Sequence, residues 1–129
     1  MSNSENIVEY ILVNKELGMS VGKIAGQVAH AQTLIDREYN GLVTDYFDTN
    51  YIGSSEEMND YYNWLNKNNQ VKVVLRAKES QLLKAIDMGG IPVHDNGKTE
   101  IVKGSLTVVA FRPQPKSNLE NFTKRLQLL

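Results

Sequence analysis

The chain has 129 residues, no cysteine, a net charge of −1 and 41% hydrophobic residues, which predicts one globular domain over residues 1–129. The absence of cysteine excludes a disulfide framework, a thiol nucleophile and a thiolate metal site. No apolar run approaches the roughly 20 residues of a membrane span, and residues 1–6 lack the pattern of a signal peptide. We therefore expect a cytoplasmic protein without a membrane partner, with residues 1–5 flexible.

Acidic and basic residues are unevenly distributed along the chain. Residues 36–60 contain seven Asp or Glu and one Arg, whereas residues 61–129 contain eleven Lys or Arg and five Asp or Glu. This separation can make one face of a protein positive although its total charge is near zero. The alternative is that the lysines simply lie on a solvated surface.

The N-terminal part has the pattern of a strand, a turn and a long helix. Residues 7–14 form an apolar run rich in β-branched and aromatic side chains, which predicts a central strand covered on both faces. Residues 15–18 predict a turn, and Ser20 can cap a helix that extends to about residue 39. This order favours an α/β layer fold.

Further helices are expected in the rest of the chain. One begins at Ser55, carries Trp64 on its core-facing side and ends near residue 68. Two more are expected over residues 80–88 and 117–126. Residues 40–55 fit either a continued helix or an ordered loop.

Three further strands are expected between these helices. Residues 71–77 and 106–111 have the composition of buried strands. Residues 91–94 form a short extended segment whose proline favours the edge of a sheet.

The first predicted helix has three faces when its residues are placed at about 100° intervals. Lys23, Gln27 and His30 share a polar face because spacings of four and three residues bring side chains together. The apolar face consists of Val21, Ile24, Val28, Ala31 and Ile35, and the small-residue face consists of Gly22, Gly26, Ala29 and Thr33. Each glycine weakens a helix by about 1 kcal/mol relative to alanine. We therefore expect close packing of the small-residue face or a ligand there. The protein's own sheet is the favoured packing partner, and a second copy in a homodimer is the alternative.

Common catalytic and cofactor motifs are absent from the sequence. The segment from Gly18 to Ile24 has three residues between its glycines where a phosphate-binding loop has four, and it lacks the following Ser or Thr. His30 and His94 have no neighbours at metal-ligand spacing, and there is no G-x-S-x-G elbow. We expect neither a metal nor another cofactor. The polar residues 95–99 fit either an ordinary turn or part of a site.

Three blocks of sequence carry a more specific signal. They are G-K-I-A-G-Q-V-A-H-A at residues 22–31, D-N-G-K-T-E-I at residues 95–101 and G-S-L-T-V-V-A at residues 104–110. In this order they resemble the type II peptidyl-tRNA hydrolase family. The resemblance extends over about residues 7–39 and 64–129.

The resemblance implies an α/β fold with a small mixed four-stranded β-sheet and α-helices packed on both faces. It also implies metal-independent hydrolysis of the ester that joins a peptidyl or N-acyl-aminoacyl group to the 3′ end of tRNA. The family's site residues correspond here to Lys23, Gln27, His30, Asp95 and Thr99. Candidate contacts to tRNA phosphates are Lys98, Lys103 and Arg112.

The chain departs from the family pattern at Ser20, Val21, His94 and Arg112, and residues 40–63 form a divergent segment. These changes bear on tRNA affinity and substrate choice more than on the reaction. They motivate a second hypothesis, a non-catalytic adaptor that binds RNA or a protein on the same fold. A third hypothesis is hydrolysis of a different acyl ester or amide.

The expected site suggests a hydrolytic mechanism without a covalent nucleophile. Asp95 would orient or deprotonate water, with Thr99 fixing the position of either, and Lys23 would stabilise developing negative charge or hold the terminal phosphate. Gln27 would bind the substrate carbonyl or the terminal ribose. His30 would either take part in proton transfer or brace the helix.

Overall fold

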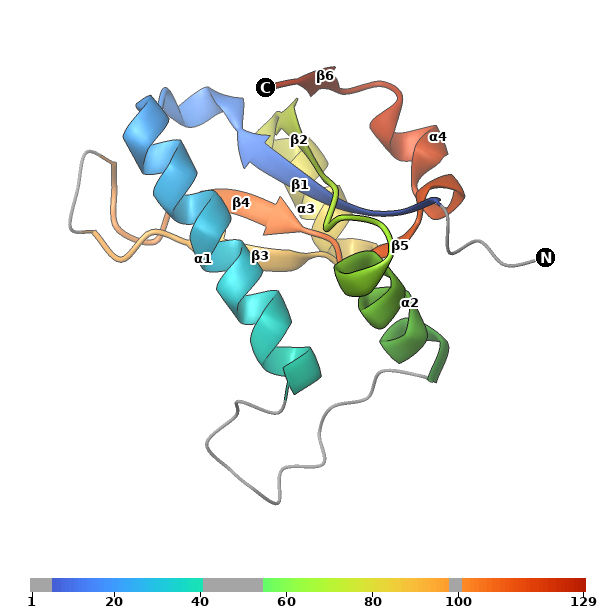
Figure 1. The fold of residues 1–129 in the computed structure, drawn as a ribbon. Helices are drawn as coiled ribbons and strands as arrows, with labels where there is room; N and C mark the ends of the chain where they lie inside the picture. Colours follow the sequence, from blue (N-terminus) through green and yellow to red (C-terminus); the bar gives the residue numbers. More distant parts are fainter. Residues whose placement is uncertain (1–5, 41–54, 98–100) are drawn as a thin grey trace.

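The computed structural model describes residues 6–40, 55–97 and 101–129, and Figure 1 shows their arrangement. Strand β1 (Ile7–Asn14) is central, parallel to β2 (Lys72–Ala77) and antiparallel to β4 (Leu106–Ala110). Strands β3 (Ile91–His94) and β6 (Gln127–Leu128) form the two edges. The central position of the first strand and the edge position of the proline-containing strand are confirmed.

Within the described residues the sheet has six strands, two more than the four expected. The additional strands are β5 (Gln114–Pro115), which pairs with the start of β1, and β6, which pairs with β2. Each has only two residues, too short for an alternating pattern to be recognised in the sequence. The predicted helix over residues 117–126 is also too long, because the chain forms a 3₁₀ turn, η3 (Lys116–Asn118), and a single helical turn, α4 (Glu120–Thr123), before β6.

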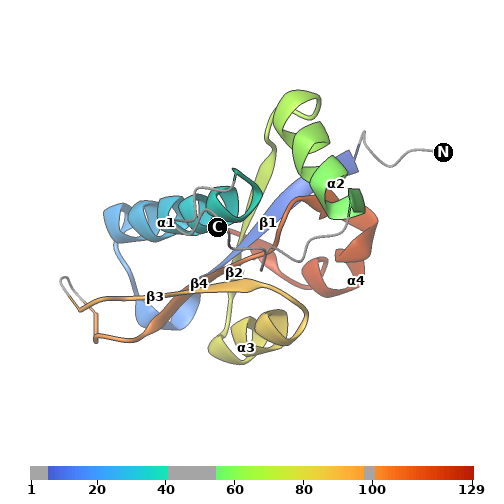
Figure 2. The same ribbon diagram turned by 90° about the horizontal axis from the view of Figure 1, so that it is seen from below.

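Helices cover both faces of the sheet, which confirms the expected three layers (Figure 2). Helices α1 (Val21–Asn40) and α2 (Ser55–Asn66) lie on one face, and α3 (Glu79–Asp87) and α4 lie on the other. A 3₁₀ turn, η2 (Lys15–Leu17), joins β1 to the segment before α1. Residues 1–5 and 41–54 lie outside the described residues. The flexibility predicted for the first segment and the helix or ordered loop predicted for the second stay predictions.

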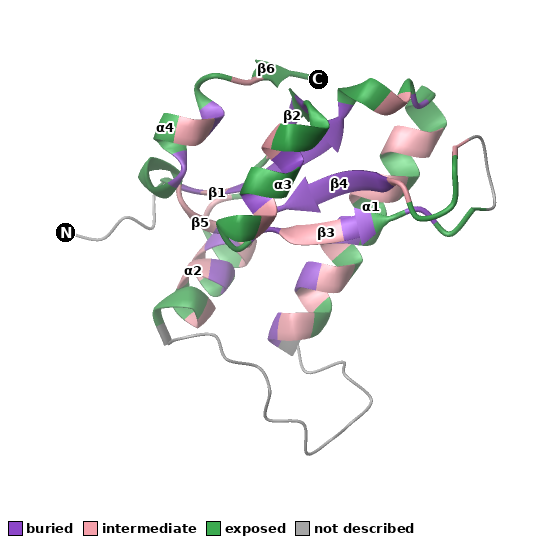
Figure 3. Cartoon of the chain, turned by 180° about the vertical axis from the view of Figure 1, so that it is seen from behind, coloured by how far each residue is buried: buried purple, intermediate pink, exposed green. Residues whose placement is uncertain are grey.

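The alternation of side chains along β1 supplies both halves of the core. Ile7, Ile11 and Val13 pack under α1 and α2, whereas Tyr10 and Leu12 pack on the side of α3 and α4. Figure 3 shows that β4 is buried along its length between these layers. The prediction for Trp64 is confirmed, since only 1% of this residue is exposed and its indole N–H donates to the Val71 carbonyl at 2.8 Å.

The small-residue face of α1 does not pack on the sheet, so that expectation is wrong. Gly22, Gly26 and Ala29 are exposed, and a Cβ atom added at either glycine would meet no atom within 4 Å outside its own helix. The helix instead buries Ala31 and Ile35 completely, with Ile24 and Val28 half-buried, while Val21 at its start is 85% exposed. The expected apolar face is thus correct except at its first residue.

Asn14 ties three segments together where β1 ends. Its side chain is buried and donates to the Leu106 carbonyl at 2.9 Å and to a carboxylate oxygen of Glu79 at 3.2 Å. Its own side-chain oxygen accepts from the Glu16 N–H at 2.9 Å. The end of β1, the start of β4 and the start of α3 are therefore held together at one end of the sheet, where β1 stops.

Glu9 is a buried acid in the middle of this architecture. It lies on β1 opposite Lys72 of β2, is fully buried, and neither of its carboxylate oxygens has a hydrogen-bond partner among the described residues. Burial raises the pKa of Glu9 to about 8, an effect that Lys72 and the nearby Gln32 side chain oppose and Asp36 reinforces. Glu9 is therefore protonated in the folded protein at neutral pH.

The raised pKa of Glu9 predicts a pH-dependent stability that Glu9→Gln removes. In the unfolded chain this carboxyl titrates near 4.5, so its contribution is fully present below that pH and is lost as pH rises toward 8. Glu9→Gln should leave stability at pH 4 nearly unchanged and raise the free energy of unfolding at pH 9 by several kcal/mol, because the pKa of Glu9 in the folded protein lies far above its value in the unfolded chain. Urea unfolding at both pH values measures this, with the exposed Glu120→Gln as control. Equal pH dependence of Glu9→Gln and the wild type would contradict the assignment.

Candidate active site

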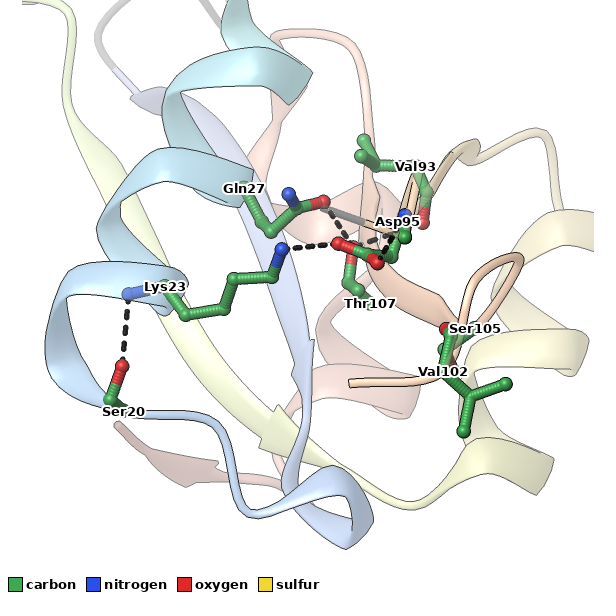
Figure 4. A network of polar contacts seen from close by, with 9 residues as sticks. Ser20, Lys23, Gln27, Val93, Asp95, Val102, Ser105 and Thr107 are labelled. Atoms are coloured by element: carbon green, nitrogen blue, oxygen red, sulfur yellow. Dashed lines mark hydrogen bonds and ion pairs between the residues drawn. The ribbon is translucent and has the colours of Figure 1, made fainter. Parts of the chain in front are cut away.

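A cluster of polar side chains lies between the first turns of α1 and the hairpin formed by β3 and β4. Figure 4 shows Lys23 and Gln27 of α1 pointing toward Asp95, which follows β3, and Thr107 of β4. The spacing of four residues places Lys23 and Gln27 one above the other on α1. The structure therefore brings together three of the five residues expected at the site, together with Thr107.

Lys23 and Asp95 form a buried ion pair. The Lys23 ammonium contacts the Oδ1 atom of Asp95, and the two side chains are only 8% and 0% exposed, respectively. The second oxygen, Oδ2, accepts the Gly97 N–H at 2.7 Å. The hydrogen bond from Lys23, helped by the one from Gly97, lowers the pKa of Asp95 below its ordinary value although burial opposes this. Asp95 is therefore a carboxylate at neutral pH, and both of its oxygens are held.

The backbone of the β3–β4 hairpin fixes Asp95 in place. Its N–H donates to the Ser105 carbonyl at 2.9 Å, and its carbonyl accepts the Gly104 N–H at 2.8 Å. Gly97 has a φ of +82°, and a Cβ atom there would lie 2.6 Å from Cβ of Lys103. Only glycine fits this position, so the turn that donates to Asp95 depends on it. The stem of Lys103, a candidate phosphate contact, thus lies beside the Asp95 turn.

The start of α1 fixes the direction of Lys23. The Ser20 hydroxyl accepts the Lys23 N–H at 3.3 Å, and the Ser20 carbonyl accepts the Ile24 N–H at 2.9 Å. The predicted helix cap at Ser20 is confirmed. Because Lys23 lies in the first turn, the positive end of the helix dipole adds to its charge near Asp95.

Thr107 belongs to this cluster but is not among the site residues predicted from the sequence. It is completely buried, and its hydroxyl oxygen lies 2.7 Å from Oε1 of Gln27 and 3.0 Å from the Val93 carbonyl oxygen. A hydroxyl has one proton, so Thr107 donates to one of these oxygens at a time. A threonine in the otherwise apolar strand Leu106–Ala110 is the signal that could have identified it.

Of the remaining predicted site residues, the structure describes His30, Lys103 and Arg112. His30 is exposed. Arg112 pairs with Glu38 at 2.7 Å and donates to the Gly89 carbonyl at 3.1 Å. Glu38 lies fifteen residues beyond Lys23, or about 22 Å along α1, so Arg112 is at the opposite end of that helix. Lys98 and Thr99 lie outside the described residues.

Neither a cluster of metal ligands nor a membrane span occurs in the described part of the chain. Within residues 6–40, 55–97 and 101–129, no group of three or more His, Cys, Asp or Glu side chains could hold a metal ion. No helix among these same residues is long and apolar enough to cross a membrane.

The geometry of the cluster predicts how the pKa of Asp95 depends on Lys23. Lys23→Met removes the main cause of the lowered pKa and leaves the burial of the carboxylate in place. The pKa of Asp95, measured by NMR titration of its side-chain carboxyl, should therefore rise. Lys103→Met is the control, because the Lys103 side chain lies next to the same turn but forms no ion pair with Asp95. An unchanged pKa in Lys23→Met would contradict the described pairing.

Comparison with known proteins identifies relatives over almost the whole chain. A relative named peptidyl-tRNA hydrolase from Sulfolobus acidocaldarius is 33% identical over 92% of this chain and 97% of its own length. One of the same name from Methanococcus vannielii is 32% identical over 92% and 96%. Peptidyl-tRNA hydrolase 2 of Saccharomyces cerevisiae is 32% identical over 92% of this chain, which spans 56% of the yeast protein.

The family comparison agrees with these relatives. Residues 7–129 match the sequence profile of the family described as peptidyl-tRNA hydrolase PTH2. The matched region contains the Lys23–Asp95 pair, Gln27 and Thr107, as well as every strand of the sheet. The chain belongs to the peptidyl-tRNA hydrolase PTH2 family.

Proposed function

We propose that this protein hydrolyses the ester between a peptidyl or N-acyl-aminoacyl group and the 3′ end of tRNA. The observation that carries the proposal is the buried Lys23–Asp95 pair, which places a fixed cation and a fixed carboxylate beside the Gln27 amide. The names of the relatives and the family match support the substrate class.

The reaction consumes one water molecule and needs no covalent bond to the enzyme. The water oxygen attacks the ester carbonyl carbon and releases one proton to the surrounding solvent, and a tetrahedral intermediate with a negative oxygen forms. The bond from that carbon to the ribose oxygen then breaks, and the ribose oxygen takes up a proton from the solvent. The products are a free carboxylate on the peptide, a free hydroxyl on the tRNA and one proton released to the solvent.

Lys23 supplies the positive charge that this intermediate requires. Its ammonium is largely shielded from water, and an electrostatic interaction is stronger in such surroundings than in bulk solvent. Asp95 holds the ammonium in position, so the group is in place before the substrate arrives. An oriented donor of this kind stabilises the developing oxyanion without further reorganisation.

Asp95 acts by orientation rather than by removing a proton. Its lowered pKa makes it a weak base at neutral pH, and both of its oxygens already accept hydrogen bonds. We propose that it aligns the attacking water as well as Lys23, and that Thr99 completes the position of this water. We choose orientation of water over its deprotonation because both oxygens of Asp95 already accept hydrogen bonds.

Gln27 and His30 are proposed to face the substrate in different ways. The hydrogen-bonding contact between Gln27 and Thr107 holds the amide near Lys23, where it can bind the substrate carbonyl or the terminal ribose. His30 is exposed one turn further along α1. Exposure favours contact with bound RNA over a bracing role within the helix.

We also propose that hydrolysis is independent of metal ions, because Lys23 can supply the positive charge for which many hydrolases use a metal. The substrate class supports our proposal that the protein acts with the translation machinery in the cytoplasm. The homodimer stays a prediction, and its proposed contact is the exposed small-residue face of α1, where a second backbone can approach closely. Lys103 remains a proposed phosphate contact beside the Asp95 turn.

Release of the acyl group from N-acetyl-aminoacyl-tRNA, with and without EDTA, tests the proposed reaction. The wild type should cleave equally well in both conditions, and Asp95→Asn and Lys23→Ala should each reduce kcat by about 100-fold or more. Lys84→Ala, an exposed change on α3, is the control and should be fully active. Circular dichroism verifies that each variant is folded.

Two results would contradict the proposal. Full turnover by both folded site variants would show that the reaction takes place elsewhere. If the folded wild type binds tRNA but releases no acyl group, the chain acts as the non-catalytic adaptor instead.

A further inference from the structure

A second polar site lies on the protein, apart from the Lys23–Asp95 pair. It is a cavity of about 280 Å³ whose lining includes four basic side chains, Lys15, Arg76, Lys78 and Arg125, together with Gln81. All four basic residues are exposed. The tRNA contacts expected from the sequence include none of these residues.

Four separate segments of the chain build this cavity. Lys15 follows β1, Arg76 lies near the end of β2, Lys78 precedes α3, and Arg125 precedes β6. The pairing of β6 with β2 brings the C-terminal segment to this place, with Arg76 opposite Gln127. Arg76 donates from Nε to the Leu128 carbonyl at 3.1 Å, which holds its guanidinium at the cavity. The fold thus brings the four basic residues together, and they do not form a run in the sequence.

The positive charge of this cavity is not neutralised by ion pairs. No carboxylate lines it, and none of the four basic side chains forms an ion pair within the described part of the chain. Glu16 and Glu79, which follow Lys15 and Lys78 in the chain, do not line the cavity. Their carboxylates accept hydrogen bonds from the Glu79 N–H and from Asn14, respectively. Four cations that converge on one cavity repel one another unless an anion is bound, so the cavity is suited to phosphate.

The cavity opens at the same end of the sheet as the candidate active site, namely the end at which β1, β2 and β3 stop. Asn14 and Ala77, at the ends of β1 and β2, are paired, and Asp95 follows β3 at this end. In the strand order β3-β4-β1-β2, three strand spacings separate Asp95 from Lys78, or about 14 Å. Figure 1 shows β6, η2 and the start of α1 at the same end of the molecule.

Part of the opposite end of the sheet is acidic. A larger cavity there, of about 480 Å³, is lined by Glu56, Glu57 and Asp60 at the start of α2, with Arg112 as its basic residue. A polyanion is therefore attracted to the basic cavity and is repelled by the carboxylates at this acidic cavity.

We propose that the basic cavity binds backbone phosphates of the tRNA whose 3′ ester lies at the Lys23–Asp95 pair. This inference rests on the proposed function, since it assigns the path of the same substrate across this end of the sheet. The cavity holds the RNA at a distance from the reacting atoms. It therefore contributes to the affinity for tRNA and to its salt dependence, and it leaves the chemical step unchanged.

The double variant Lys78→Gln/Arg125→Gln tests this assignment without changing Arg76, whose side chain contacts the backbone of β6. The matched control is Lys67→Gln/Lys116→Gln, which removes two exposed basic residues next to a cavity at the other end of β1. The substrates are full-length N-acetyl-aminoacyl-tRNA and N-acetyl-aminoacyl-adenosine, which has no RNA backbone. Binding of deacylated tRNA is measured in parallel at several salt concentrations.

The cavity variant should raise KM for the tRNA substrate about tenfold with kcat unchanged, and it should reduce the slope of log affinity against log salt by about 1 to 2. Its turnover of the adenosine substrate should equal that of the wild type. The control should match the wild type in all measurements.

The inference is overturned if the cavity variant binds and cleaves tRNA like the control, or if it loses turnover of the adenosine substrate to the same extent. Failure of the proposed function gives a different result. In that case the wild type cleaves neither substrate, while the cavity variant still loses affinity for deacylated tRNA relative to the control, and the phosphate site stands without the hydrolase assignment.

Discussion

The buried ion pair between Lys23 and Asp95 connects the first turn of α1 to the end of β3. A buried charge is tolerated only when its partner and its remaining hydrogen bonds are in place. Here the cap at Ser20 directs Lys23, and the Gly97 N–H and the hairpin backbone hold Asp95. The proposed chemistry uses the same groups, so the constraint that orders this corner of the fold also prepares it for hydrolysis.

The end of the sheet at which this pair lies, where β1, β2 and β3 stop, is the proposed functional end of the molecule. Asn14 joins the end of β1 to the start of β4 there, and the parallel strand β2 ends beside it. Since β6 closes against β2, the C-terminal segment contributes to this same end. Segments from the start, the middle and the end of the chain therefore converge where an RNA substrate would lie, and the acids of α2 lie at the other end.

The sequence is most informative where side-chain patterns repeat or where a motif fixes the chemistry. The strand at residues 7–14, the cap at Ser20 and the pairing of Lys23 with Gln27 on one helix face follow from spacing, and the structure has all three. Two-residue strands give no such pattern, and the basic cavity depends on long-range pairing that no local spacing encodes. Exposure of Gly22 and Gly26 differs from the prediction because the tilt and rotation of a helix on a sheet are set by tertiary packing. Arg112 illustrates the same limit, since only the fold places it beside Glu38.

A double-mutant cycle on Lys23 and Asp95 tests most directly whether the ion pair is the catalytic unit. The kcat/KM for N-acetyl-aminoacyl-tRNA would be measured for the wild type, Lys23→Met, Asp95→Asn and the double variant, each verified to be folded. If the pair acts as one unit, the double variant will be about as slow as the slower single variant. Losses that multiply in the double variant would show that the two residues act independently, and they would contradict a shared role for Lys23 and Asp95 in hydrolysis.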